Sequence, residues 1–309
     1  MAEDRTLGST LRRPALRRLL GRGAEGGARS GNASALVRVL HDPVGTTCIL
    51  VALVIIAACA MAPWLAPYDP TQIYAGERFE APSWEFWLGT DHLGRDMFSR
   101  VLYGGQIALQ VAFASIATAL TLGLALGLIA GFGPKWLDAA ILLLFDTVRS
   151  FPVVIFGLAV LTVLGASLYT VIFVVAVTSV PTFGRVARTQ TLSLKNNEFI
   201  LAERSMGAGM GRILRVHVLP NAIGPLLILA SMDIPIVITI EAGLSFLGMG
   251  VQPPTPSWGN ILNDGFSYIR QAPWPVIAGG MPLIVTTLVF TFLGETLRDL
   301  FDPKLRRDL

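Results

Sequence analysis

Charged residues are scarce in this chain of 309 residues. Asp, Glu, Lys and Arg together make up 15% of it, whereas 53% of its residues are hydrophobic. Its mean hydropathy is +0.61. Soluble domains carry about 25% charged residues. The composition therefore excludes an ordinary soluble domain and indicates a protein that lies mostly in a membrane.

Catalytic and metal-binding motifs are also missing. No phosphate-binding loop of the form G-x-x-x-x-G-K-[ST] occurs, and neither does an H-E-x-x-H or G-x-S-x-G motif. The three histidines lie in separate segments. Cys48 and Cys59 are about 16 Å apart along one expected helix, too far for a disulfide. We expect no catalytic residue, cofactor or metal in this chain, and we expect the cysteines to serve packing alone.

Six apolar segments, each close to the roughly 20 residues that cross a bilayer, predict the fold. We place them at residues 46–66, 105–132, 139–163, 167–189, 222–249 and 276–297. They lack the two-residue alternation of membrane-barrel strands and therefore predict an all-α polytopic membrane protein with six transmembrane helices. This membrane domain is expected to cover residues 46–309, after an arginine-rich leader at 1–45 that we expect to be mostly disordered.

Basic residues set the expected orientation of the spans. The leader, the 190–221 loop and the C-terminal tail are rich in Arg and Lys, whereas the 67–104 loop holds six acidic residues against three arginines. Because basic loops stay on the inner side, both termini and the 190–221 loop are expected to be cytoplasmic. The 67–104 and 250–275 loops then face outward.

Four charged residues fall inside the expected spans. Asp146 and Arg149 lie in the third span, and Asp233 and Glu241 lie in the fifth. Since such charges rarely face lipid, these residues are candidates either for the translocation path or for structural hydrogen bonds. Asp146 and Arg149 could pair across one helical turn, and Glu241 better suits a structural role. Pro152 predicts a kink in the third span.

The second span has a repeating pattern of small residues. Gly123, Gly127 and Gly131 recur at four-residue spacing. Such a face lets helix backbones approach closely, so it predicts tight helix packing. The packing partner could lie in this chain or in a second subunit.

A polar stretch interrupts the apolar pattern between the fourth and fifth spans. Its sequence, NNEFILAERSMGAGMGRILRVHVLPN, predicts two short helices around a glycine turn. Asn197 can cap the first helix, and Gly207 suits the left-handed residue that ends it. We interpret the stretch as a helical hairpin that docks another protein at the inner membrane face. An ordinary amphipathic loop is the alternative.

The polar stretch resembles the EAA loop of binding-protein-dependent ATP-binding-cassette (ABC) permeases. That pattern is E-A-A-x-x-x-G, nine residues, and then I-x-L-P, and the residues that match it are Ala202, Gly207, Leu219 and Pro220. The residues that depart from it are Leu201, Glu203 and His217. Three further stretches, WLGTDHLGRDMFSRVLYGGQIAL, GLSFLGMGVQPPTPSWGNIL and LGETLRDLFDPKLR, are similar to C-type subunits of dipeptide and oligopeptide permeases.

The resemblance implies a type I ABC importer permease with the MetI-like fold, which translocates di- or oligopeptides inward by ATP-driven alternating access. The implied partners are a homologous B-type permease subunit, two ABC ATPase subunits that bind ATP and Mg, and an extracytoplasmic substrate-binding protein. The implied location is the plasma (inner) membrane of a prokaryote. The alternatives are an importer of nickel or glutathione from the same family, a self-contained proton-coupled carrier that uses Asp146, Asp233 and Glu241, or a membrane scaffold or channel.

The resemblance also assigns residues to the contacts with these partners. Glu203 and Arg204 are expected to face a groove on the ATPase. The full set of expected coupling residues is Glu198, Ala202, Glu203, Arg204, Gly207, Arg212, Leu219 and Pro220. The outer tryptophans are expected either to contact the binding protein or to anchor the chain at the membrane surface. They are Trp84, Trp87, Trp258 and Trp274.

Overall fold

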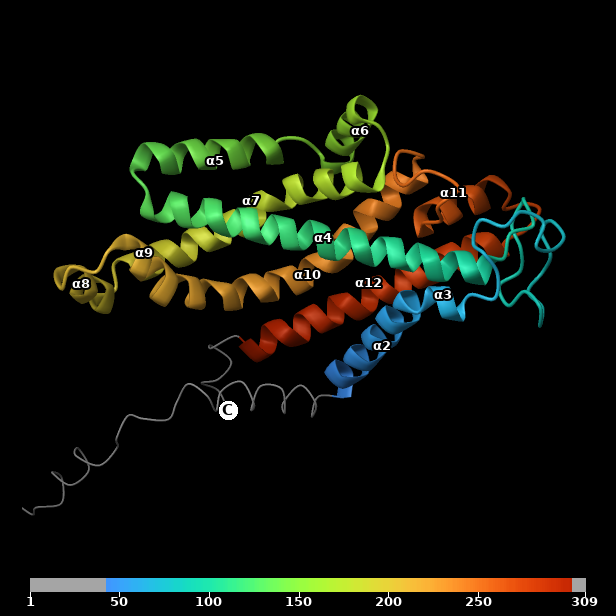
Figure 1. Ribbon diagram of the computed structural model, residues 1–309, viewed down its shortest axis with the longest axis horizontal. Coiled ribbons are helices and arrows are strands. Elements are labelled where there is room, and N and C mark those ends of the chain that lie inside the picture. Colours follow the sequence, from blue (N-terminus) through green and yellow to red (C-terminus); the bar gives the residue numbers. More distant parts are fainter. Residues whose placement is uncertain (1–42, 302–309) are drawn as a thin grey trace, which may run out of the picture.

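The computed structural model describes residues 43–301 and is built of helices (Figure 1). The leader predicted at 1–45 lies outside the described residues except for its last three, and so does the C-terminal tail. In chain order the elements are α2 (Pro43–Ala60), α3 (Ala62–Leu65), α4 (Met97–Phe132), α5 (Lys135–Arg149), α6 (Val153–Leu164), α7 (Leu168–Lys195), α8 (Glu198–Ser205), α9 (Met210–Ile213), the π-helical turn η1 (Leu214–Val218), α10 (Leu219–Phe246), α11 (Trp258–Ser267) and α12 (Trp274–Phe301). The described residues contain no β-strand, only an isolated bridge between Thr90 and Asp96, which confirms the all-α prediction.

Five segments are long and apolar enough to cross a membrane: α2, α4, α7, the run from α9 to α10, and α12. A sixth span requires α5 and α6 to count together, and these helices meet at 87°. The kink predicted at Pro152 is therefore a full break between two helices. Pro152 explains the break, because it has no N–H to continue the helix and it restricts the residue before it.

Two helix boundaries also differ from the sequence prediction. α4 begins at Met97 rather than at residue 105, because the Asp96 carboxylate accepts a hydrogen bond from the Ser99 N–H at 2.8 Å and caps the helix. The outer segment 250–275 was expected to be a loop, but it contains α11. Ser257 caps α11 by accepting a hydrogen bond from the Asn260 N–H at 3.2 Å.

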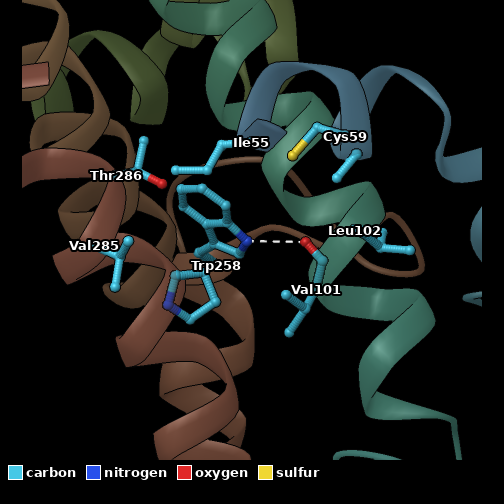
Figure 2. A pocket seen from close by; sticks show the side chains of 9 residues that line it. Ile55, Cys59, Val101, Leu102, Trp258, Val285 and Thr286 are labelled. Carbon is cyan, nitrogen blue, oxygen red and sulfur yellow. Dashed lines mark hydrogen bonds between the residues drawn. The ribbon is translucent and has the colours of Figure 1, made fainter. Parts of the chain in front are cut away.

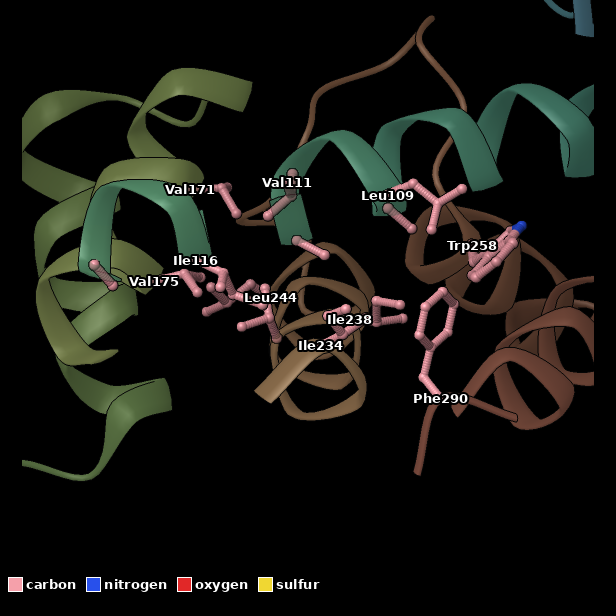
Figure 3. Packing of buried hydrophobic residues seen from close by; sticks show 14 of the residues in the cluster. Leu109, Val111, Ile116, Val171, Val175, Ile234, Ile238, Leu244, Trp258 and Phe290 are labelled. Atoms are coloured by element: carbon pink, nitrogen blue, oxygen red, sulfur yellow. The ribbon is translucent and has the colours of Figure 1, made fainter. Parts of the chain in front are cut away.

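The glycine face of α4 packs against α7, so its partner lies within this chain. A Cβ atom placed on Gly123 would lie 2.6 Å from the Phe183 Cβ, and one on Gly127 would meet the Gly184 carbonyl oxygen. A methyl group on this face would therefore push the two helices apart. Beside this contact, side chains of α4, α7, α10 and α12 form the main apolar core, which includes Ile116, Ile238 and Phe290 (Figure 3).

At the end of the molecule opposite α8 and α9, the helices are joined around Trp258 of α11. Its indole is 1% exposed and donates from Nε1 to the Val101 carbonyl of α4 at 2.9 Å (Figure 2). Beside it, Cys59 of α2 and Thr286 of α12 line a small apolar cavity of about 140 Å³. Both cysteines are free and buried, as expected for residues that serve packing.

Candidate functional sites: the helical hairpin and the polar face

The polar stretch between α7 and α10 folds as a helical hairpin, as predicted. It lies at one end of the molecule, and α11 and the 67–96 loop lie at the other (Figure 1). α8 ends at a turn in which Gly207 has a φ of 88°. The Gly207 N–H donates to the Arg204 carbonyl at 3.0 Å, and the Ala208 N–H donates to the Glu203 carbonyl at 3.0 Å. These two bonds form a Schellman motif, which confirms the left-handed conformation expected of Gly207.

A small apolar cluster fixes the hairpin to the end of α4. Ile200 of α8 and Ile213 of α9 are buried against Phe132 of α4. The Lys195 ammonium donates to the Gly131 carbonyl at 3.1 Å and so satisfies a backbone group at the helix end. The hairpin is therefore a packed element with its own core, which argues against an ordinary amphipathic loop.

Most of the expected coupling residues are exposed on this hairpin. Glu198, Ala202, Arg204, Gly207, Arg212 and Pro220 are exposed, and Leu219 is half-buried. Asn197 precedes α8 as predicted, but its side chain makes no capping hydrogen bond. Exposed apolar side chains flank the turn, because Met206 is 77% exposed and Met210 is 51% exposed.

Glu203 has two basic neighbours within the hairpin. Its carboxylate lies 3.5 Å from His217 Nε2 and 4.0 Å from Arg212 Nε, and its side chain is 25% exposed. It therefore lies between the two arms of the hairpin. That it also faces an ATPase groove stays a prediction. The sequence missed His217 as its partner, because the two residues meet only when the glycine turn folds the arms together.

Glu203→Lys is expected to lower transport several-fold without lowering the amount of inserted chain. The new ammonium would lie beside the Arg212 guanidinium, and this repulsion would separate the arms of the hairpin. The measurement is substrate uptake per inserted chain. Glu295→Lys, an exposed reversal on α12, is the matched control and should leave uptake unchanged. Equal effects of the two variants would contradict the bridging role.

Inside the membrane segments, the predicted pair of Asp146 and Arg149 does not form. Asp146 of α5 pairs with Arg185 of α7. Arg149 donates from Nη1 to the Thr182 hydroxyl of α7 at 2.9 Å. α7 packs alongside α5, and it presents Thr182, Arg185 and Arg188 at three-residue intervals, so the partners on the neighbouring helix replace the expected local pair.

The polar residues that α7 presents at three-residue intervals continue toward the hairpin. Arg188 forms a bidentate ion pair with Asp138 of α5, with bonds of 2.5 and 2.6 Å. Asp233 of α10 interacts with Ser179 and Arg149. Arg185 and Arg188 were not among the residues predicted from the sequence. Their three-residue spacing, opposite the acidic residues of the preceding span, was the signal that could have found them.

Glu241 lies apart from these polar residues. Its side chain is 0% exposed. Oε1 accepts a hydrogen bond from the Ser245 hydroxyl at 2.7 Å. The hydroxyl of Ser257, at the start of α11, also lies near this carboxyl group. Oε2 has no hydrogen-bond partner among the described residues. A carboxyl group buried at the junction of α10 and α11 favours the structural role over a place on the translocation path.

A buried ion network fixes the 67–96 loop to α11. The Asp91 carboxylate lies 2.6 Å from Arg95 Nε, and Arg95 Nη2 lies 3.2 Å from Asp264 of α11. Arg100 of α4 lies between the same carboxylates, 3.6 Å from Asp91. Asp91, His92 and Asp264 come close enough together to ligate a cation. However, the arginines already neutralise both carboxylates, which argues against a metal there.

Asp91→Ala is expected to destabilise the 67–96 loop and its contact with α11 by roughly 3–5 kcal/mol, because it leaves two buried arginines without their main counter-charge. The change should appear as faster proteolysis of the 67–96 loop and a lower unfolding temperature of the purified chain. Glu85→Ala, an exposed substitution in the same loop, should change neither. If both variants resisted proteolysis equally well, the ion network would not be what fixes the loop.

The outer tryptophans divide into two groups. Trp258 is buried, and Trp274 donates from Nε1 to the Thr90 carbonyl at 3.3 Å, so these two hold the fold together. Trp84 is 99% exposed and Trp87 is 62% exposed, and with Pro82 and Ser83 they line a shallow hollow. Only this second group is available for an external partner or for the membrane surface.

Together these features define a membrane-spanning transport subunit: a bundle of spans with a charged face, a packed hairpin at one end and an ordered loop region at the other. Residues 123–307 match the family model of binding-protein-dependent transport system inner membrane components. The chain belongs to this family. Residues 33–82 match the N-terminal transmembrane domain of oligopeptide transport permease C.

The relatives of the chain include several named permeases. It is 38% identical to the dipeptide transport system permease protein DppC of Alkalihalophilus pseudofirmus, over 83% of this chain and 86% of the relative. It is 39% identical to the glutathione transport system permease protein GsiD of Pectobacterium atrosepticum, over 87% of this chain and 90% of the relative. The fold is shared with an inward-facing MetNI methionine ABC transporter, at a TM-score of 0.55 and 20% identity, over 67% of this chain and 98% of that chain.

Proposed function

We propose that this chain is a permease subunit of an ABC importer that translocates di- or oligopeptides. The dipeptide permease of Alkalihalophilus pseudofirmus and the di/tripeptide permease of Pseudomonas aeruginosa, the latter 37% identical over 83% of this chain, support a peptide substrate. The match to oligopeptide transport permease C supports the same class. The location that follows is the inner membrane of a prokaryote, with both termini and the 190–221 loop cytoplasmic.

The hairpin is the observation that carries the proposal. It exposes apolar Met206 and Met210 around an ordered turn, while the chain has no nucleotide-binding motif of its own. Exposed apolar side chains on a rigid element are typical of a protein interface. The hairpin therefore docks one of two ABC ATPase subunits, which bind ATP and Mg. The remaining partners are a homologous second permease and an extracytoplasmic substrate-binding protein.

The hairpin is also connected to the membrane segments without a flexible link. The run from Met210 to Phe246 is continuous and passes from α9 through η1 into α10. A movement of the docked ATPase would therefore be transmitted along the helix to α10. This direct linkage suits alternating access, in which ATP-driven closure of the ATPases shifts the permease between inward- and outward-facing states.

Uptake by the reconstituted complex tests the proposal. Vesicles that hold this chain with its partners should accumulate a labelled dipeptide only when ATP is hydrolysed. Collapse of a proton gradient should leave this uptake unchanged. Uptake that follows the proton gradient without ATP, and that fails when Asp146 and Asp233 are neutralised, would replace the importer with the self-contained carrier. Nucleotide-independent leakage would indicate a channel.

Glutathione is a second candidate substrate, because a glutathione permease is 39% identical to this chain. Nickel has no comparable support among the relatives named here. The same vesicles, loaded with binding protein and offered glutathione, the dipeptide or nickel, separate the three. A peptide importer should take up the dipeptide faster than the other two substrates.

A further inference from the structure

Charged side chains remain exposed on one side of α5 and α7. The side chain of Asp146 is 66% exposed and that of its partner Arg185 is 43% exposed. Arg149, one turn further along α5, is exposed as well. On the adjoining side of α5, Leu143 and Leu144 are exposed and apolar. The helix therefore presents an apolar surface suited to lipid beside a polar surface that is not.

The polar surface lies near the middle of the membrane. α5 begins at Lys135 and Trp136, and Trp136 is 70% exposed, which is typical of a residue at the membrane–water interface. Asp146 follows Lys135 by eleven residues, or about 16 Å of helix. The hydrocarbon core is about 30 Å thick. Exposed charges at this depth require water or another protein chain beside them.

The break between α5 and α6 supports the same conclusion independently. Ser150, Phe151 and Pro152 join the two helices and are all exposed. Backbone outside a helix is not found facing lipid at this depth, because its N–H and C=O groups would lack partners there. It occurs only where protein covers it or where it lines a water-filled cavity. The exposed charges and the exposed break share one side of the molecule, and both exclude lipid from it.

Arg149 differs from the other basic residues of this surface. Arg185 is paired with Asp146, and Arg188 is paired with Asp138. Among residues 43–301, Arg149 has no carboxylate within ion-pairing distance, and its hydrogen bond goes to the neutral hydroxyl of Thr182. Asp233 interacts with Arg149 through its charge but does not form an ion pair with it. Arg149 thus retains guanidinium donors for an anionic ligand.

We propose that this surface is a wall of the peptide path and that Arg149 binds the C-terminal carboxylate of the peptide. The assignment rests on the proposed function. A guanidinium and a carboxylate match in charge and in bidentate geometry. All peptides with a free C-terminus carry this carboxylate, so a contact with it serves a path that must accept many different side chains. The pair of Asp146 and Arg185 holds α5 to α7 beside this position.

Transport of a peptide and of its C-terminal amide by the complete complex tests the assignment. Alanyl-alanine and alanyl-alanine amide are supplied at concentrations that saturate the binding protein. Wild-type and variant complexes share the same binding protein, so a change in the ratio of the two fluxes reports on the permease alone. Arg149→Gln should lower the flux of the free acid about tenfold and leave that of the amide unchanged. Arg149→Lys, which keeps the charge, should retain the preference for the free acid.

Three results would overturn the assignment. If Arg149→Gln lowers both fluxes by the same factor, the residue has a structural role, such as a contact with the second permease. If neither flux changes, Arg149 does not contact the peptide. If the wild-type complex takes up no peptide, the proposed function fails and the assignment fails with it. Arg270→Gln, an exposed arginine after α11, is the matched control and should preserve both fluxes.

Discussion

Gly207→Val is expected to abolish ATP-driven transport while the chain still inserts in normal amounts. Gly207 has a φ of 88°, which is costly for a β-branched residue, by roughly 1–3 kcal/mol. No atom lies within 4 Å of a Cβ placed there, so the substitution acts on the backbone conformation alone. The Schellman turn would open and re-aim α9 relative to α8. The measurement is ATP-driven uptake per inserted chain.

Gly209→Val provides the matched control in the same turn. Gly209 precedes α9 with a φ of −69° and a ψ of 152°, a conformation that valine adopts readily, and it too has no neighbour within 4 Å of its Cβ position. This variant should transport like the wild type. If the two valines had equal effects, the backbone conformation of Gly207 would not be what the hairpin requires.

Gly127→Val is expected to have a different effect from Gly207→Val. It should lower the amount of folded chain in the membrane, whereas Gly207→Val should leave that amount unchanged and abolish transport. A Cβ atom there would meet the Gly184 carbonyl oxygen and lie 2.6 Å from the Ala187 Cβ. Neither neighbour can rotate away, so α4 and α7 would have to separate. We expect a loss of about 3 kcal/mol or more, at the upper end of overpacking effects. Thermal unfolding of the purified chain, together with its level in the membrane, measures this loss.

Gly224→Val is the control for this second substitution. Gly224 lies in α10, and no atom lies within 4 Å of its Cβ position. A valine there should preserve the unfolding temperature within a few degrees, because a one-residue change in helix propensity is worth less than about 1 kcal/mol. A chain that tolerated valine at Gly127 as well as at Gly224 would rule out close packing of α4 on α7.

The long spans could be predicted from the sequence because a membrane helix is specified by a simple quantity, an uninterrupted run of apolar residues. The length of an apolar run could not show that the third predicted span, at residues 139–163, is two helices. Pro152 is visible in the sequence, but a proline in a membrane helix can produce either a mild kink or a full break. Pro181, Pro225, Pro235 and Pro282 lie inside continuous helices of this chain. The outcome at Pro152 depends on what α6 packs against, which is a tertiary property.

The hairpin was predicted well because its signals are local. A glycine turn with a φ above zero, a helix on each side and a proline near the end of the stretch are all properties of neighbouring residues. The partners of Glu203, Asp146 and Arg149 were predicted wrongly or not at all. Each of these side chains is satisfied by a residue 9 to 39 positions away, counted from the positions of the paired residues. Spacing along one helix gives no information about such contacts.

Purification of this chain from its own membrane most directly tests the central claim that it is one subunit of an ATP-driven importer. A tag on the chain, gentle extraction and mass spectrometry of the recovered proteins would identify its partners. We predict recovery of a second permease together with ABC ATPase subunits, and loss of the ATPases but not of the permease when Gly207 is replaced by valine. Recovery of this chain alone, even after cross-linking in the membrane, would contradict the claim.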